Sequence, residues 1–138
     1  MKPVTQTITE PGLGNCFAAC LASLLEVPCD SVPNSPDDDE WLEKLNHWLR
    51  GTHQHVLIRV APDSSLIGRY IPFIASVDGP RGRRHAVLGF YGSKAQFCVW
   101  HDPHPDAGGP ISEPHCLYFL IALPHELAES YRKLIGLA

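Results

Sequence analysis

The sequence predicts an α+β fold in which helices near the N-terminus pack on a mostly antiparallel β-sheet. In the first 50 residues apolar side chains recur at intervals of three and four, which is typical of helices with one buried side. From residue 55 onward, short runs rich in β-branched and aromatic residues alternate with Gly, Pro and Asp, which is typical of strands joined by turns. Helices first and strands afterwards indicate an α+β arrangement.

Length and composition fit one domain spanning residues 1–138. Of the 138 residues, 44% are hydrophobic and 19% are charged, which is enough for a core without disulfide or metal support. The net charge of −4 gives no general attraction to nucleic acid or to anionic membranes, so we expect neither as a partner. Because no signal-like or membrane-spanning segment is found and the five cysteines form no disulfide framework, we expect a cytoplasmic protein.

The first helix is predicted from about Cys16 to Glu26. Asn15 precedes it, and because asparagine is a good N-cap residue we expect its side chain to cap the helix. Pro28 disfavours helical geometry at Val27 and so ends the helix. The side that packs holds Phe17, Cys20, Leu21, Leu24 and Leu25.

The second helix is predicted to begin after Ser35 and to reach about Arg50. Ser35 as cap, Pro36 at the first position and the acidic run of residues 37–40 form a helix-start signal. Gly51 is placed to stop the helix. Its apolar side, which we expect in the core, holds Trp41, Leu42, Leu45, Trp48 and Leu49.

Five strands and a final helix are predicted for the rest of the chain. The strand-like runs are residues 55–60, 69–77, 84–92, 95–102 and 116–124, and the last helix runs from about His125 to Leu134. No internal repeat or long linker divides the chain.

Residues 84–102 are typical of a β-hairpin with its turn near Ser93-Lys94. With two or four residues in the loop, the numbers of opposed residues add to 187. This register opposes Phe90 to Phe97, Leu88 to Val99 and His85 to Asp102. A carboxylate beside an imidazole fixes its tautomer and stabilises the imidazolium, which is what a cysteine nucleophile needs from its base.

Cys16 is the candidate nucleophile because it stands at the first turn of the first helix. Unpaired N–H groups and the partial positive charge at a helix N-terminus both favour thiolate over thiol. The glycines before it, Gly12 and Gly14, allow a substrate backbone to approach and leave the Cys16 N–H free as an oxyanion donor.

Three motifs together, "GNCFAAC", "RHAV" and "HDP", resemble the papain-like cysteine peptidase superfamily. The resemblance is greatest to the compact branch that includes the bacteriocin-processing, double-glycine peptidase domains. It implies a papain-like fold and thiol-based acyl transfer by a catalytic triad. Cys16 is then the nucleophile, His85 the base and Asp102 the residue that orients the base.

The resemblance also implies an oxyanion-hole glutamine, usually five or six residues before the nucleophile. Glu10 and Pro11 occupy those positions here, and the upstream glutamine is Gln6, ten residues before Cys16. We carry the oxyanion role over to Gln6, which requires the segment between Pro11 and Gly14 to loop out.

We therefore expect a cysteine hydrolase without a cofactor, a peptidase or isopeptidase that acts through a thioester acyl-enzyme. A deamidase or transamidase would use the same intermediate, and the displaced glutamine favours a non-catalytic binding module on the same fold as the alternative. The substrate is a peptide or protein. Arg81, Arg83 and Arg84 flank His85, either as a solvated hairpin tip or as a rim for an acidic substrate.

The remaining cysteines and histidines suggest no second site. We expect Cys20, Cys98 and Cys116 in the core and assign no role to Cys29. A small zinc-binding interaction protein is a third alternative, but no spacing of a known zinc motif occurs and we predict no metal site. The histidines and cysteine that it would use are His101, His104, His115 and Cys116, with His53 and His55 as a further pair.

Overall fold

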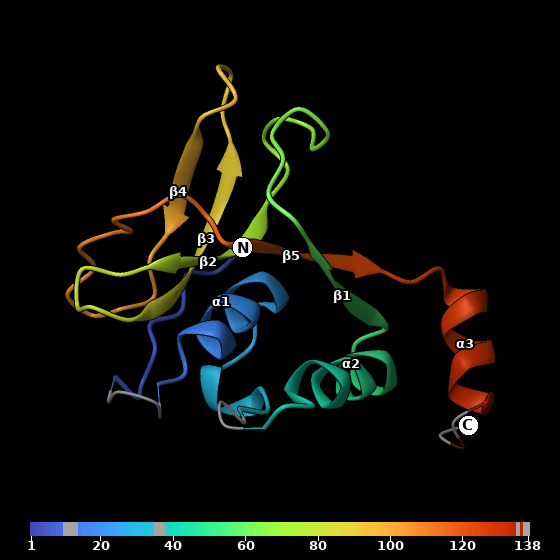
Figure 1. The fold of residues 1–138 in the computed structure, drawn as a ribbon. Helices are drawn as coiled ribbons and strands as arrows, with labels where there is room; N and C mark the ends of the chain where they lie inside the picture. Colours follow the sequence, from blue (N-terminus) through green and yellow to red (C-terminus); the bar gives the residue numbers. More distant parts are fainter. Residues whose placement is uncertain (10–13, 35–37, 135, 137–138) are drawn as a thin grey trace.

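The structure is a computed structural model that describes residues 1–9, 14–34, 38–134 and 136. It is α+β, with two helices before the sheet, as the sequence predicts (Figure 1). The helices are α1 (Cys16–Leu25), the short 3₁₀ helix η1 (Cys29–Ser31), α2 (Trp41–Thr52) and α3 (His125–Leu134). The strands are β1 (His55–Val60), β2 (Phe73–Asp78), β3 (Arg84–Tyr91), β4 (Phe97–His101) and β5 (Cys116–Ala122).

The five strands form one sheet in the order β1-β5-β2-β3-β4, and every neighbouring pair is antiparallel. The last strand, β5, lies between β1 and β2 and so joins the start of the sheet to the β2–β3–β4 meander. The predicted antiparallel sheet is therefore confirmed, together with the five strand segments.

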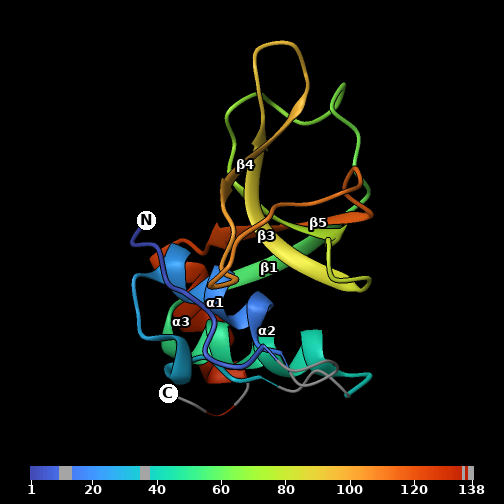
Figure 2. The same ribbon diagram turned by 90° about the vertical axis from the view of Figure 1, so that its left-hand side faces the viewer.

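The sheet has a core on each face. Helices α1 and α2 lie on the same side of the sheet in both ribbon views (Figures 1 and 2). On that side Leu21 and Leu49 pack against Ile74 and Leu88. On the opposite side a second cluster of buried apolar residues contains Phe73. Its other buried members are Ala75, Val77, Val87, Tyr91 and Leu117. Alternate residues of a strand face opposite sides of the sheet, and both sides are covered at β2 and β3. These two strands are therefore apolar almost throughout.

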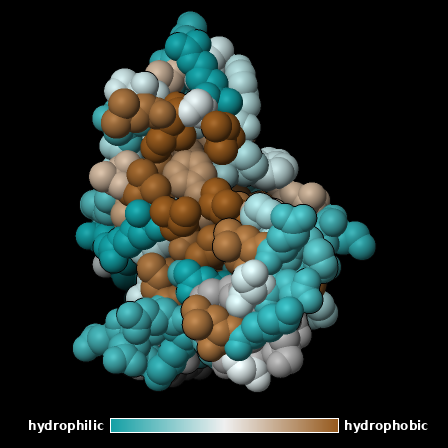
Figure 3. All heavy atoms as spheres, turned by 90° about the vertical axis from the view of Figure 1, so that its right-hand side faces the viewer, coloured by the Kyte–Doolittle hydropathy of each residue, from teal (hydrophilic) through white to brown (hydrophobic). Residues whose placement is uncertain are grey.

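The face of β1 and β5 that points away from the helices carries apolar side chains in partial contact with solvent. Ile58 is 48% exposed and Ile121 is 41% exposed. Figure 3, which looks onto the side of β1 and α3, shows apolar side chains gathered over this part of the molecule.

Helix α1 begins at Cys16, as predicted, but Asn15 does not cap it in the predicted way. Asn15 occupies the N-cap position and its carbonyl accepts from the Ala19 N–H, yet its side chain makes no capping hydrogen bond. The helix ends where Glu26 adopts a left-handed conformation, with φ of 58°. The Val27 N–H then bonds the Ala22 carbonyl, which satisfies one of the free carbonyls of the last turn.

Helix α2 begins at Trp41, later than predicted. Asp38 provides the start, since its carboxylate accepts from the Glu40 N–H at 2.8 Å. The predicted cap Ser35 and the residues that follow it, 36–37, lie outside the described residues. The prediction that Gly51 stops the helix is wrong: the helix continues to Thr52, and the left-handed conformation falls on Gln54, with φ of 56°.

The β3–β4 hairpin exists, but the predicted register is wrong. The loop has three residues, Ser93 to Ala95, because the Gly92 N–H bonds the Gln96 carbonyl and Ala95 is left-handed. Opposed numbers therefore add to 188 instead of 187. Phe90 faces Cys98 and not Phe97, and beyond a bulge at Trp100 Leu88 faces His101 and not Val99. Asp102 lies past the last paired residue of β4, and its side chain nevertheless reaches His85.

We expect Leu21→Ala to lower the free energy of unfolding by about 2–5 kcal/mol, because Leu21 is completely buried between α1 and the sheet. Leu66→Ala is the matched control, since Leu66 is 84% exposed and should change the free energy by less than about 0.5 kcal/mol. Urea denaturation of the two variants measures both values. Equal values would mean that α1 does not pack on the sheet in the way described.

Candidate active site

Cys16 is the first residue of α1 and lies half-buried against the start of β3. Its thiol lies beside the His85 ring and near the backbone N–H groups of Ala86 and Phe17, and all three stabilise its ionised form. The Phe17 N–H belongs to the first turn of the helix, where backbone donors have no partner within the helix. The local fold therefore surrounds the sulfur with donors, which favours its negatively charged form.

Asn15 closes the loop that precedes the helix instead of capping the helix. Its Oδ1 accepts from the Ile8 N–H at 2.9 Å and from the Thr7 N–H at 3.1 Å, and its Nδ2 donates to Thr7 Oγ1. The Asn15 N–H also bonds the Ile8 carbonyl at 3.2 Å. Residues 8 and 15 are thus joined at the base of a loop, and the first-turn N–H groups stay free of an asparagine cap.

Gln6 reaches the site from the segment that Asn15 holds through Thr7 and Ile8, whereas most of the segment expected to loop out, residues 11–13, lies outside the described residues. It is buried, with 6% of its surface exposed, and it lines the same cavity as Cys16. Its Nε2 donates to the Ile8 carbonyl at 2.8 Å, which uses one of two N–H bonds, and its Oε1 is buried without a hydrogen-bond partner. Such orphaned buried atoms are rare in folded proteins. The second N–H of Nε2 is the donor that the amide can offer to a ligand in the cavity.

His85 and Asp102 form a buried hydrogen-bonded pair. His85 Nε2 and Asp102 Oδ1 are 2.7 Å apart, and each side chain is only 7% exposed. The carboxylate also accepts from the His104 N–H at 3.0 Å and from the Gly109 N–H at 3.1 Å. With Nε2 engaged by Asp102, the other ring nitrogen, Nδ1, is left for Cys16. The three residues that the sequence singles out therefore lie together, with His85 hydrogen-bonded to Asp102 and next to Cys16.

Each member of the chain shifts the pKa of its neighbour. Burial alone raises the pKa of Cys16, but the hydrogen bond and the charge of His85 outweigh it, so the pKa lies below the ordinary 9.0. Burial lowers the pKa of His85, whereas bonds to Asp102 and Cys16 raise it to about 9. For Asp102 burial raises the pKa and the bond to His85 lowers it, with a net decrease. At neutral pH these directions favour a thiolate, an imidazolium and a carboxylate.

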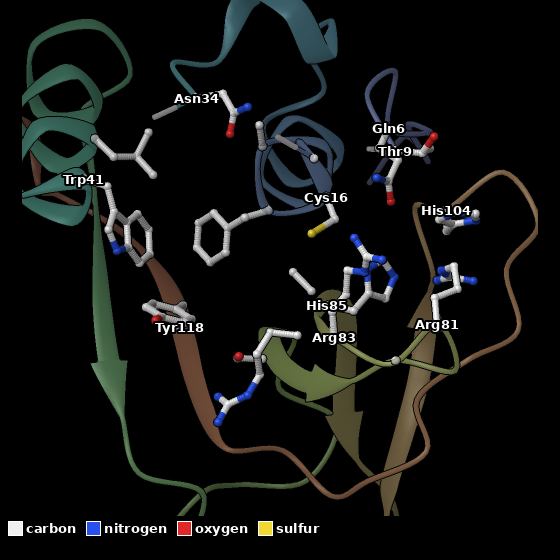
Figure 4. A pocket seen from close by; sticks show the side chains of 18 of the residues that line it. Gln6, Thr9, Cys16, Asn34, Trp41, Arg81, Arg83, His85, His104 and Tyr118 are labelled. Carbon is white, nitrogen blue, oxygen red and sulfur yellow. The ribbon is translucent and has the colours of Figure 1, made fainter. Parts of the chain in front are cut away.

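A cavity of about 540 Å³ opens over this chain of residues. Figure 4 shows Cys16 and His85 pointing toward each other in its middle, with Trp41 and Tyr118 on one side of them and Arg81 and His104 on the other. A nucleophile, a base and a polar amide around an open volume can perform acyl transfer, because a carbonyl group can enter and meet all three.

One side of the cavity is an aromatic wall made of Phe17, Trp41 and Tyr118. Phe17 packs edge to face with both other rings, with centroids 5.0–5.1 Å apart, and the rings of Trp41 and Tyr118 are tilted relative to each other, with centroids 5.7 Å apart. Burial, together with the hydrogen bond between the Tyr118 hydroxyl and Cys116 and the charge of Cys116, raises the pKa of Tyr118 to about 12, so the ring stays neutral. Trp41 packs against the core, as predicted, but it also lines the cavity, which the sequence analysis did not foresee.

Several contributors to the site were missed at the level of sequence. The Asn15 loop closure and the backbone donors of Ala86 and Gly109 leave no signal in residue type. Tyr118 does leave one: with Cys116 and Leu120 it follows the two-residue period of β5, and this period places it on the face that the helices cover.

The other four cysteines are free thiols with different surroundings. Cys20 and Cys116 are buried, as predicted. The prediction that Cys98 lies in the core is wrong, because β4 is an edge strand and the Cys98 side chain is half-buried at its surface. Cys29, to which no role was assigned, is buried and accepts a hydrogen bond from Asn15 Nδ2 at 3.3 Å.

The histidines considered for a zinc site do not come together. His101 Nε2 contacts the Val4 carbonyl at 2.8 Å, His115 contacts Asp78 at 3.0 Å, and His104 packs its ring against that of His85. Within the described residues, no three His, Cys, Asp or Glu side chains are grouped as a metal ion requires.

No protein-family model, curated protein or solved structure significantly matches this chain. In the part of the chain that the structure describes, no helix has the length and apolar character that crossing a membrane requires.

We expect Cys16 to react with iodoacetamide between about pH 6 and 7 faster than the other four cysteines, because His85 and the helix end stabilise its thiolate. In His85→Ala the reactivity should fall to that of an ordinary thiol with a pKa of about 8.5 or above, since the largest contribution that opposes burial is then removed. Mass spectrometry of a briefly alkylated sample locates the label. A label on Cys29 or Cys98 with Cys16 unmodified contradicts the assignment of the nucleophile.

Proposed function

We propose that this chain is a papain-like cysteine hydrolase that cleaves peptide or isopeptide bonds through a thioester. The observation that carries the proposal is that Cys16 lies next to a hydrogen-bonded His85–Asp102 pair, beside a cavity large enough for a peptide segment. Two further features agree with the papain-like arrangement that the sequence motifs imply: a cysteine at a helix N-terminus, and a histidine–aspartate pair at strand ends.

In the first half of the reaction the Cys16 thiolate attacks the carbonyl carbon of the substrate. The oxygen becomes an oxyanion, for which the Cys16 N–H and the free N–H of Gln6 Nε2 are the donors. The tetrahedral adduct collapses, the C–N bond breaks, and His85 gives its proton to the departing amine. The products of this half are a free amine and a thioester on Cys16.

In the second half His85, now neutral, removes a proton from water, and the resulting hydroxide attacks the thioester carbonyl. The C–S bond breaks, the acid leaves, and the thiolate–imidazolium pair is restored. Asp102 keeps the ring in place through both halves, because Nε2 remains hydrogen-bonded to its carboxylate while Nδ1 exchanges the proton.

Gln6 favours a competent oxyanion site over the alternative of a binding module. The alternative rests on the displaced position of the glutamine in the sequence and on the bond that Nε2 already makes with Ile8. The Asn15 loop closure compensates for the displacement, since it lets Gln6 line the cavity with Cys16. Deamidation or transamidation would use the same thioester with a different leaving group or acceptor. Five free thiols support a place in the reducing cytoplasm.

The proposal is tested by hydrolysis of a quenched-fluorescence peptide library by the purified protein. Wild type should cleave members of the library, Cys16→Ala should cleave none, and Cys98→Ala, a change at the surface of β4, should behave as wild type. Against pH, kcat/KM should rise as Cys16 ionises, below pH 9.0, and fall near pH 9 as His85 loses its proton. Hydrolysis that survives in Cys16→Ala would refute the thioester route.

Asp102→Asn should lower kcat/KM at least about tenfold and move the high-pH limb of the profile to lower pH. The sign follows from the carboxylate, whose bond to His85 and whose charge both raise the pKa of the imidazole to about 9. Removing the charge lowers that pKa. Asp106→Asn, on the same loop but exposed, is the matched control and should leave the profile in place. An unmoved high-pH limb in Asp102→Asn would show that something else orients His85.

A further inference from the structure

The side of the cavity opposite the aromatic wall carries positive charge on a well-defined turn. Residues 79–83 join β2 to β3: the Gly79 N–H bonds the Arg83 carbonyl at 2.9 Å and the Gly82 N–H bonds the Gly79 carbonyl at 3.2 Å. Gly82 is left-handed, with φ of 79°, so the loop is a tight turn closed by a glycine. Arg81 and Arg83 are therefore presented beside His85 from a fixed backbone (Figure 4).

These two guanidinium groups have no carboxylate partner among the described residues, unlike the third arginine of the turn. Arg84 Nε lies 3.5 Å from Asp78 Oδ1. Arg81 donates to the Ala107 carbonyl at 3.1 Å, which satisfies a hydrogen bond but neutralises no charge. For the Arg83 guanidinium no polar contact within the described part of the chain is found.

The lining of the cavity has a charge opposite to that of the chain. The whole protein carries −4, yet in the described residues the cationic side chains that line the cavity are Lys44, the three arginines and His85. No Asp or Glu is among the lining residues, and the one anionic group, the Cys16 thiolate, is paired with the imidazolium of His85. Lys44 is paired with Asp38. Unpaired positive charge is thus concentrated at Arg81 and Arg83, and a negatively charged ligand is the complement.

The arginine side and the aromatic wall lie on different sides of the reacting groups, Cys16 and His85. Each side can therefore be assigned to one part of a substrate, the leaving part or the acyl part. A leaving group must lie next to His85, because His85 supplies its proton. Arg81 and Arg83 lie beside His85, whereas the aromatic wall begins at Phe17, the residue after the nucleophile, and lies on the other side of Cys16 (Figure 4). The leaving part of a substrate therefore faces the arginines and the acyl part faces the aromatic wall.

We infer that the site selects peptides with a large apolar side chain in the acyl part and an aspartate or glutamate in the leaving part. The inference rests on the proposed hydrolase function. Arg81 and Arg83 bind the carboxylate, Arg83 with all its donors available, and Phe17, Trp41 and Tyr118 bind the apolar side chain. Arg84 supports the turn through Asp78 and does not contact the acid.

The test uses matched peptides that differ only by Asp or Asn at one of the first three positions after the scissile bond, each with Phe or Ala in the acyl part. At one of these positions kcat/KM for Asp should exceed that for Asn about tenfold. Arg83→Gln should reduce this ratio at least about fivefold, and raising the salt from about 0.05 to 0.5 M should reduce it too. Arg69→Gln makes the same change in charge at Arg69, which bonds Ser93 far from the cavity, and should leave the ratio unchanged.

Failure of this inference is separable from failure of the proposed function. If wild type hydrolyses the Asp and Asn peptides equally at every position, the acidic preference is wrong. If Arg83→Gln keeps the full ratio, the assignment of the preference to Arg83 is wrong. In both cases the hydrolase assignment stands. If no peptide is hydrolysed, fluorescence anisotropy with Cys16→Ala measures the binding of the same peptides. About tenfold tighter binding of the Asp peptide that Arg83→Gln abolishes supports the anion subsite, and equal binding overturns it.

Discussion

The hydrogen bond between His85 and Asp102 is the contact on which the site depends. An ionised carboxylate that is 7% exposed is costly unless its oxygens are bonded, and here one imidazole and two backbone N–H groups bond them. The same bonds fix the loop after β4, since the N–H groups of His104 and Gly109 converge on one side chain. They also fix the ring of His85, so its second nitrogen is directed at Cys16. One buried charge therefore orders a loop, the His85 ring and the neighbouring Cys16 thiol together.

On the helix side, the conformation of Asn15 keeps the N–H groups of the first turn of α1 available to the Cys16 sulfur. An asparagine in the N-cap position usually accepts from the second or third N–H of its helix, and those donors would then be lost to a thiolate. Here its amide bonds Thr7 and Ile8 instead. The first turn keeps a free donor for the Cys16 sulfur, from Phe17, and the N-terminal segment is held where Gln6 can line the cavity. The bonds of Asn15 to Thr7 and Ile8 thus explain both why its side chain does not cap α1 and how Gln6, ten residues before Cys16, lines the cavity.

The sequence predicts the elements well because hydrophobic period and breaking residues are local, and β1 and α3 have the bounds expected from them. The sequence also predicts that His85 and Asp102 lie side by side, which is correct, but the strand register used for that prediction is wrong. The three-residue loop shifts the hairpin by one and the bulge at Trp100 shifts it again, and neither depends on apolar pairing. The prediction for the pair survives because Asp102 lies beyond the ladder, where its side chain reaches His85 without facing it. Structural roles that depend on backbone geometry, such as the bonds of Asn15 to Thr7 and Ile8, cannot be predicted from the pattern of residue types.

The thiols of Cys16 and Cys20 lie close together in the chain but have pKa values shifted in opposite directions. They are one turn apart in the same helix, and burial raises the pKa of both. Cys20 has no compensating partner, its pKa is well above 9.0, and its thiol is an apolar core group. Cys16 lies at the helix end, where His85 and backbone N–H groups more than offset the same effect. The difference between an inert and a reactive thiol is therefore set by the start of β3 and by the residue that follows β4. Neither lies within 65 residues of the cysteine along the chain, so the chemistry exists only when helix and sheet have packed.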